Sequence, residues 1–87
     1  MYKNKSRDGK NNFCGSTIRA LRLAMPGQPS QRQFADLLQL HGLDLDKNAV
    51  QRIECGLRFI TDIELRVIAQ VLGVSCDLLL ELPTQQP

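Results

Sequence analysis

Four polar side chains spaced three and four positions apart could act together: Lys47, Asn48, Gln51 and Arg52. They are two cations and two amides, with no acid among them. Lys47 lies four positions before Gln51, and Asn48 lies four before Arg52. On a helix each pair would share one outer face. Lysine and arginine hydrogen-bond to guanine O6 and N7, whereas asparagine and glutamine bind adenine N6 and N7. The four side chains therefore suit base edges in the DNA major groove.

The surrounding stretch has the signals of a short helix. Asp46 can cap its start, and Gly56 can take the left-handed turn that ends it. Val50 and Ile53 are three apart and are expected to face the core. A helix over residues 47–55 would then present the four polar side chains outward. An ordinary solvated helix face is the alternative interpretation.

Other site chemistries are not expected. The three cysteines, Cys14, Cys55 and Cys76, lack metal-ligand spacing, and the chain has one histidine, so we predict no metal site. Cys14 and Cys76 should be small core residues. Cys55 should be a neutral neighbour of the polar face, with a redox switch as the alternative. We find no nucleophile–base pair and no phosphate-binding glycine loop, and therefore expect no enzyme, cofactor or small-molecule substrate.

Charge is distributed unevenly along the 87 residues. Residues 1–33 contain seven Lys and Arg and one acid, whereas residues 34–87 contain four bases and eight acids. A basic N-terminal part favours a polyanionic partner. We expect residues 1–11 to form a flexible basic arm, although such an arm could also serve solubility alone. Three of its cations are candidate contacts to the DNA backbone: Lys3, Lys5 and Arg7.

Five helical patterns and no strand alternation predict an all-α fold. The patterns cover residues 12–25, 30–42, 46–56, 61–73 and a short stretch that begins at 75. Ser30 with Gln33 and Thr61 with Glu64 have the spacing of capping boxes. The fourth helix is expected to bury five apolar side chains: Ile63, Val67, Ile68, Val71 and Leu72. We expect one domain over residues 12–82 and a tail over residues 83–87.

No apolar run approaches the ~18–20 residues that span a bilayer. The start of the chain also lacks the apolar stretch of a signal peptide. We therefore expect a cytoplasmic protein that does not enter membranes.

The order of these elements resembles the phage repressor/Cro-like (Xre-type) helix-turn-helix domain. The resemblance covers roughly residues 13–82 and rests on SQRQFADLL, AVQRIECGLRFITDIEL and IAQVLGVSCDLLL. It implies a five-helix, lambda-repressor-like bundle in which the second and third helices form the DNA-reading pair. Within that pattern Lys47, Asn48 and Arg52 match base-reading positions, and Gln51 lies next to them.

The resemblance also implies roles outside the third helix. Gln31 matches a first-turn glutamine of the second helix that contacts a phosphate and braces the recognition helix. Arg58 matches a basic position that touches the DNA backbone. Arg22 and Glu54 match a partly buried structural ion pair.

The chain departs from the common family pattern in length. It has about five more residues between Ala35 and the third helix, which is more than one helical turn. We expect the second helix to extend and the following turn to be wider, as in a longer-turn subtype of the family. Phe59 and residues 79–82 are expected either to cap the core or to form a dimer patch.

These features predict a sequence-specific DNA-binding transcriptional regulator that acts as a repressor. One small domain covers only a half-site, so we expect a homodimer on a palindromic operator with half-sites about 34 Å apart. The alternative is a protein-interaction module, an antitoxin or adaptor, that docks a partner through its apolar C-terminal helix without reading bases.

Overall fold

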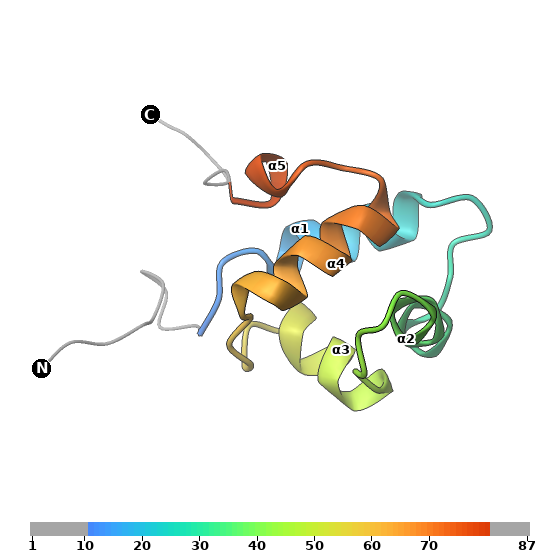
Figure 1. The fold of residues 1–87 in the computed structure, drawn as a ribbon, viewed down its shortest axis with the longest axis horizontal. Helices are drawn as coiled ribbons and strands as arrows, with labels where there is room; N and C mark the ends of the chain where they lie inside the picture. The colour runs from blue at the N-terminus through green and yellow to red at the C-terminus, as the bar shows by residue number, and fades with distance from the viewer. Residues whose placement is uncertain (1–10, 81–87) are drawn as a thin grey trace, which may run out of the picture.

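The computed structural model describes residues 11–80, where it contains five α-helices and no β-strand (Figure 1). The all-α prediction is therefore confirmed for this part of the chain. The helices are α1 (Gly15–Ala24), α2 (Gln31–Leu40), α3 (Lys47–Glu54), α4 (Asp62–Leu72) and α5 (Cys76–Leu80).

Four helices begin at side-chain caps; at the shortest, α5, the Ser75 hydroxyl accepts from the Leu78 amide at 3.2 Å. Ser30 accepts a hydrogen bond from the Gln33 amide, and the Gln33 side chain accepts one from the Ser30 amide. Thr61 and Glu64 form the same reciprocal pair at the start of α4. At α3, the Asp46 carboxylate accepts from the Ala49 amide at 2.8 Å. Each cap pairs an amide that the first helical turn would otherwise leave without a partner.

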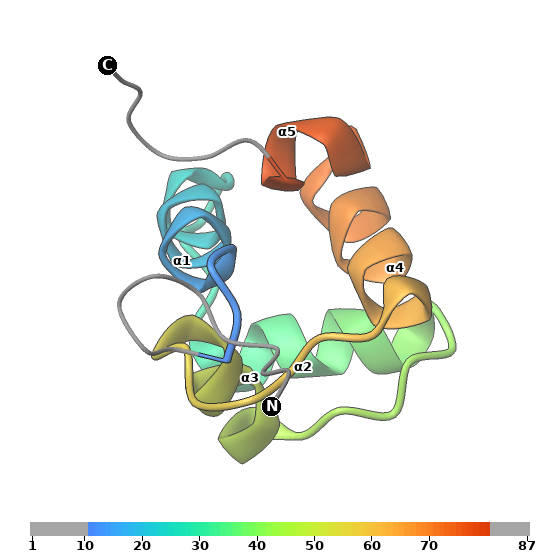
Figure 2. The ribbon, with the colours of Figure 1, turned by 90° about the vertical axis from the view of Figure 1, so that its left-hand side faces the viewer.

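Every helix contributes to one apolar core. The largest fully buried side chains are Ile18, Phe34, Leu38, Val50, Ile53, Ile68 and Leu79. α3 packs against α1 and α2, while α4 packs against α2 and α5. Figure 2 shows α2 and α3 together at one end of the bundle, with α1 and α4 extending from them on either side. This packing leaves α3 at the edge of the fold, with one face toward the core.

We expected the second helix to extend and the following turn to be wider. α2 ends at Leu40, and residues 41–46 form a wide connection to α3. Leu43 and Leu45 are buried in the core, and the Gln39 side chain donates to the Leu45 carbonyl at 3.1 Å. Alternate leucines therefore anchor the additional residues against the core, which leaves the outer face of α3 exposed.

One core prediction for α4 is wrong. Ile63 is 70% exposed, although its spacing from Val67 suggested a buried position. Ile68 is buried, whereas Val67, Val71 and Leu72 are half-buried against the core. Ile63 lies in the first turn of α4, on the side away from Ile68, where the preceding loop does not cover it.

The expected arm, the tail and the C-terminal end of the fifth helical pattern lie largely outside the described residues. Asn11, placed in the arm by its sequence, belongs to the folded part instead, because its backbone amide donates to the Gly56 carbonyl at 2.8 Å. Within residues 11–80, no helix combines the length and apolar character that crossing a membrane requires.

Candidate nucleic-acid interface

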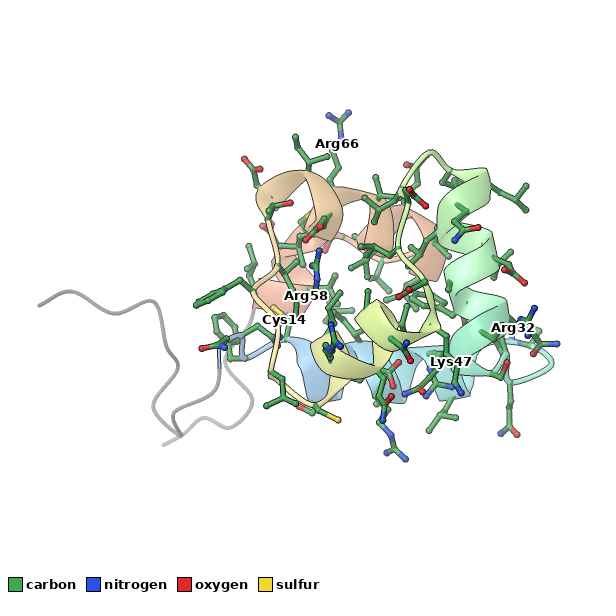
Figure 3. The ribbon with its side chains drawn as sticks, turned by 90° about the horizontal axis from the view of Figure 1, so that it is seen from below. Cys14, Arg32, Lys47, Arg58 and Arg66 are labelled. Carbon is green, nitrogen blue, oxygen red and sulfur yellow. The ribbon has the colours of Figure 1, made fainter. Side chains whose placement is uncertain are left out.

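The outer face of α3 carries the four polar side chains singled out from the sequence. Lys47, Asn48, Gln51 and Arg52 are all exposed. At 3.6 residues per turn they lie within an arc of roughly 140° around the helix axis, and exposed Cys55 lies inside the same arc. Among residues 11–80, none of the four side chains makes a hydrogen bond or ion pair. Figure 3 looks onto α3 and shows Lys47 near its N-terminal end.

The first turns of α2 and α3 carry cations and no acids. Arg32 lies in the first turn of α2 and Lys47 in that of α3, whereas α4 begins with Asp62 and Glu64. A helix N-terminus carries partial positive charge, so a cation there is unfavourable by about 0.3–1 kcal/mol. Arg32 is exposed and was missed from the sequence. The sequence signal for Arg32 is a cation just after the cap residue Ser30, where the helix dipole disfavours positive charge.

A buried ion pair fixes α3 relative to α1. Arg22 Nε donates to Glu54 Oε2 at 2.7 Å, and Arg22 Nη2 donates to Glu54 Oε1 at 2.9 Å. The two side chains are only 7% and 1% exposed. Hydrogen bonding to Glu54 raises the pKa of the Arg22 guanidinium despite its burial. Arg22 also donates to the Pro29 carbonyl at 2.9 Å, which ties the α1–α2 turn to the same group.

Gln31 completes this network from α2. Its side-chain nitrogen donates to Glu54 Oε1 at 3.0 Å, so it braces α3 in the way the resemblance implied. The phosphate contact expected of Gln31 has no support in this geometry, because the amide nitrogen points to an internal partner. Arg22, Gln31 and Glu54 thus join α1, α2 and α3 through one charge-assisted cluster.

A second set of contacts holds the C-terminal end of α3. The Asn12 side chain donates to the carbonyls of Ile53 at 3.1 Å and Arg58 at 2.7 Å, and it accepts from the Gly15 amide at 2.8 Å. Gly56 has a φ of 80°, and its amide and that of the next residue bond back into the last turn of α3. Asn12, which precedes α1, therefore holds the C-terminal end of α3 in place. No periodic pattern in the sequence signals this contact.

Replacing Gly15 with alanine tests how closely α1 approaches α3. A Cβ at Gly15 would overlap the Ile53 carbonyl oxygen. Alanine favours a helix over glycine by about 1 kcal/mol, but relieving this overlap requires movement of backbone. We expect a net loss of about 1–3 kcal/mol in the free energy of unfolding, measured by urea denaturation. Ser16→Ala, at an exposed neighbouring position, should be nearly neutral. Equal stability of the two variants would contradict this close approach.

Arg58 is placed differently from its expected role at the DNA backbone. Its Nη1 and Nη2 donate to the two carboxylate oxygens of Glu64 at 2.8 and 2.9 Å. Hydrogen bonding from Arg58 lowers the pKa of the Glu64 carboxyl group, so the pair remains charged at neutral pH. The positive charge of Arg58 is thus compensated within the protein, which disfavours the expected contact to the DNA backbone. Lys3, Lys5 and Arg7 lie outside the described residues.

The remaining candidate chemistry is limited. Cys14 is buried, which raises the pKa of its thiol, and Cys76 is half-buried. In the described part of the chain, no three His, Cys, Asp or Glu side chains gather in a way that could hold a metal ion.

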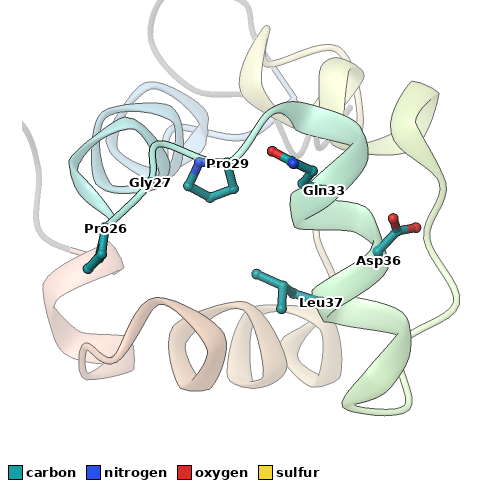
Figure 4. A pocket seen from close by; sticks show the side chains of 6 residues that line it. All are labelled: Pro26, Gly27, Pro29, Gln33, Asp36 and Leu37. Carbon is teal, nitrogen blue, oxygen red and sulfur yellow. The ribbon is translucent and has the colours of Figure 1, made fainter.

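A shallow hollow of about 370 Å³ lies along α2 and the turn that precedes it (Figure 4). It is lined by Pro26, Gly27, Pro29, Gln33, Asp36 and Leu37. Asp36 is the one ionisable group in this lining, so the hollow lacks the paired acid and base that proton-transfer catalysis uses. It shares no residue with the polar face of α3.

Comparison with known proteins adds no assignment to this geometry: no family model matches the chain, and neither the curated proteins nor the solved structures searched give a match.

Proposed function

We propose that this protein is a sequence-specific DNA-binding regulator in which α3 enters the major groove. The observation that carries the proposal is the exposed arc of Lys47, Asn48, Gln51 and Arg52. These side chains combine both base-reading chemistries, since the cations suit guanine and the amides suit adenine. By occupying its site, such a domain would act as a repressor.

The supports of α3 favour this proposal. Base reading requires side chains on a rigid element, because loosely held groups lose conformational entropy when they bind. Glu54 is fixed by Arg22 and Gln31 within the bundle, and Asn12 holds the following carbonyls. The reading helix is thus held from its inner side, while its outer side is left for a partner.

The cations at the helix starts favour an anionic partner in particular. Arg32 and Lys47 stand where the helix dipole already creates positive potential. A DNA phosphate near the start of α2 would make the placement of Arg32 favourable. The first amides of α3 can bind a second phosphate, in competition with the Asp46 carboxylate that caps this helix. We propose Arg32 as a backbone contact together with Lys3, Lys5 and Arg7 of the N-terminal arm. Because one such domain reads a half-site, the operator should be palindromic and the bound form a homodimer.

The test is an Arg52→Ala variant assayed by binding-site selection on random duplex DNA. We expect a loss of about 1–3 kcal/mol in binding free energy and a relaxed preference at one base pair of each half-site. Arg19→Ala removes an exposed arginine from α1 and should leave the selected sequence unchanged. If the wild-type chain selects no sequence at low salt, or Arg52→Ala selects the same site equally tightly, the proposed reading face is wrong.

A further inference from the structure

Three large apolar side chains are exposed in residues 57–63, which cover the end of the α3–α4 connection and the start of α4. Leu57 is 67% exposed, Phe59 is 51% exposed and Ile63 is 70% exposed. Single exposed apolar residues are ordinary, but a local group of them marks an interaction surface. This group lies outside the polar arc of α3.

The conformation of the loop directs these side chains outward. Residues 57–61 have no helical structure, and exposed residues alternate with covered ones. Arg58 turns inward to pair with Glu64, and Ile60 packs against the core. Leu57 and Phe59, at the alternate positions, therefore face solvent. The loop thus covers part of a paired charged side chain while it exposes two large apolar ones in one short segment.

The outer face of α4 carries Ile63 of this apolar group together with one acid and one base. Asp62, Ile63, Arg66 and Gln70 are exposed and lie within an arc of roughly 100° around the helix axis. Asp62 and Arg66 are one turn apart, and around the helix axis both lie to the same side of Ile63. Neither forms an ion pair within residues 11–80. Figure 3 shows Arg66 projecting from the body of the protein, well away from Lys47.

We propose that a second copy of this chain binds the surface formed by Leu57, Phe59 and the outer face of α4. A two-fold interface places the same patch on both partners, so the patch must be self-complementary. Two antiparallel α4 helices meet this condition: Asp62 of each copy faces Arg66 of the other, and the two Ile63 side chains pack together beside these ion pairs. The flanking Leu57 and Phe59 add apolar area, and no unbalanced charge is brought together.

Charge complementarity favours a second copy over a different protein as the occupant. The face carries one acid and one base, which can pair with the base and the acid of a second copy. Docking to an acidic or a basic partner would instead favour charges of a single sign. This inference specifies the homodimer of the proposed function, and it rests on that function only in taking the dimer to be the DNA-bound form. The contact itself is drawn from residues that do not read bases.

The experiment is sedimentation equilibrium of the full chain without DNA, over a range of protein concentrations. We expect a monomer–dimer equilibrium for the wild type. Ile63→Glu should raise the dissociation constant at least about tenfold, as removal of a central apolar contact does. Leu40→Glu is the matched control, because Leu40 is 80% exposed on α2, outside the proposed surface. It should leave the dissociation constant unchanged, and thermal unfolding verifies that each variant is folded.

Charge exchange makes the test specific to the antiparallel arrangement. Asp62→Arg and Arg66→Asp should each weaken the dimer, because each places like charges opposite one another across the interface. The double variant Asp62→Arg/Arg66→Asp should restore it. A wild-type chain that stays monomeric, or a double variant as weak as the single ones, would overturn the proposal and leave this surface to a different protein.

Binding to a duplex that holds a single half-site separates this inference from the proposed function. A dimer that behaves as predicted but binds no DNA would contradict the reading role of α3 alone. Half-site binding by a strictly monomeric chain would contradict the dimer surface alone.

Discussion

Replacing Glu54 with alanine is expected to lower the free energy of unfolding by about 3–5 kcal/mol, because it leaves the buried Arg22 charge without its partner. Arg22 is largely shielded from solvent, since its side chain is only 7% exposed. The Gln31 side chain loses the same acceptor. Urea denaturation followed by circular dichroism would measure the change. A domain of ordinary stability has about 5–15 kcal/mol in total, so this variant should be at the edge of folding.

The control is the double variant Arg22→Met/Glu54→Leu. Removing both charges from a buried pair is often neutral or stabilising, whereas removing one is costly. The double variant should therefore be clearly more stable than Glu54→Ala, although the Pro29 carbonyl and the Gln31 amide lose their partners. A Glu54→Ala variant that loses less than about 1 kcal/mol would show that the pair contributes no more than an exposed one.

Affinity for DNA should depend steeply on salt. About five phosphate contacts give a slope near −4 to −5 for log affinity against log salt, which is a decrease of about 250- to 1000-fold between 50 and 200 mM. The contacts proposed are Arg32 on α2, the N-terminus of α3 and the cations of the N-terminal arm. Fluorescence anisotropy with a labelled duplex at several salt concentrations would measure the slope.

Neutralising Lys3, Lys5 and Arg7 together separates backbone binding from base reading. This change should weaken binding to all sequences alike and make the slope shallower by about 1 for each phosphate that is no longer neutralised. The preferred sequence should stay the same. Binding that hardly changes with salt would contradict a phosphate-dominated interface and favour a protein partner.

Helix starts could be predicted from the sequence because their causes are local. Ser30, Asp46 and Thr61 each accept a hydrogen bond from an amide three residues ahead, so a short window of sequence contains both partners. The left-handed residue Gly56 is local in the same way. Burial depends on the arrangement of whole helices and was less predictable. Ile63 fits the apolar period of α4, but no other element covers the first turn on that side.

The same distinction between local causes and the arrangement of whole helices applies to the candidate site. Outward placement of Lys47, Asn48, Gln51 and Arg52 follows from helical spacing, and the structure bears out their exposure. The partner of Arg58 could not be predicted from spacing. Glu64 lies six positions away and meets it only because an extended segment folds against the first turn of α4.

Asn12 and Gly15 were missed for a similar reason. They contact the end of α3, about forty positions along the chain, and such long-range contacts leave no local pattern. Their effect is nevertheless specific, because they join the start of α1 to the end of the helix proposed to read DNA.

The most direct test of the central claim is an NMR titration of the ¹³C,¹⁵N-labelled protein with its selected duplex. If the outer face of α3 reads bases, the side-chain signals of Asn48, Gln51 and Arg52 should shift at the lowest DNA additions. Gln39, whose side chain donates to the Leu45 carbonyl in the connection between α2 and α3 and lies outside the polar face of α3, should shift little. Saturable DNA binding that leaves the α3 side chains unperturbed would contradict base reading by this helix.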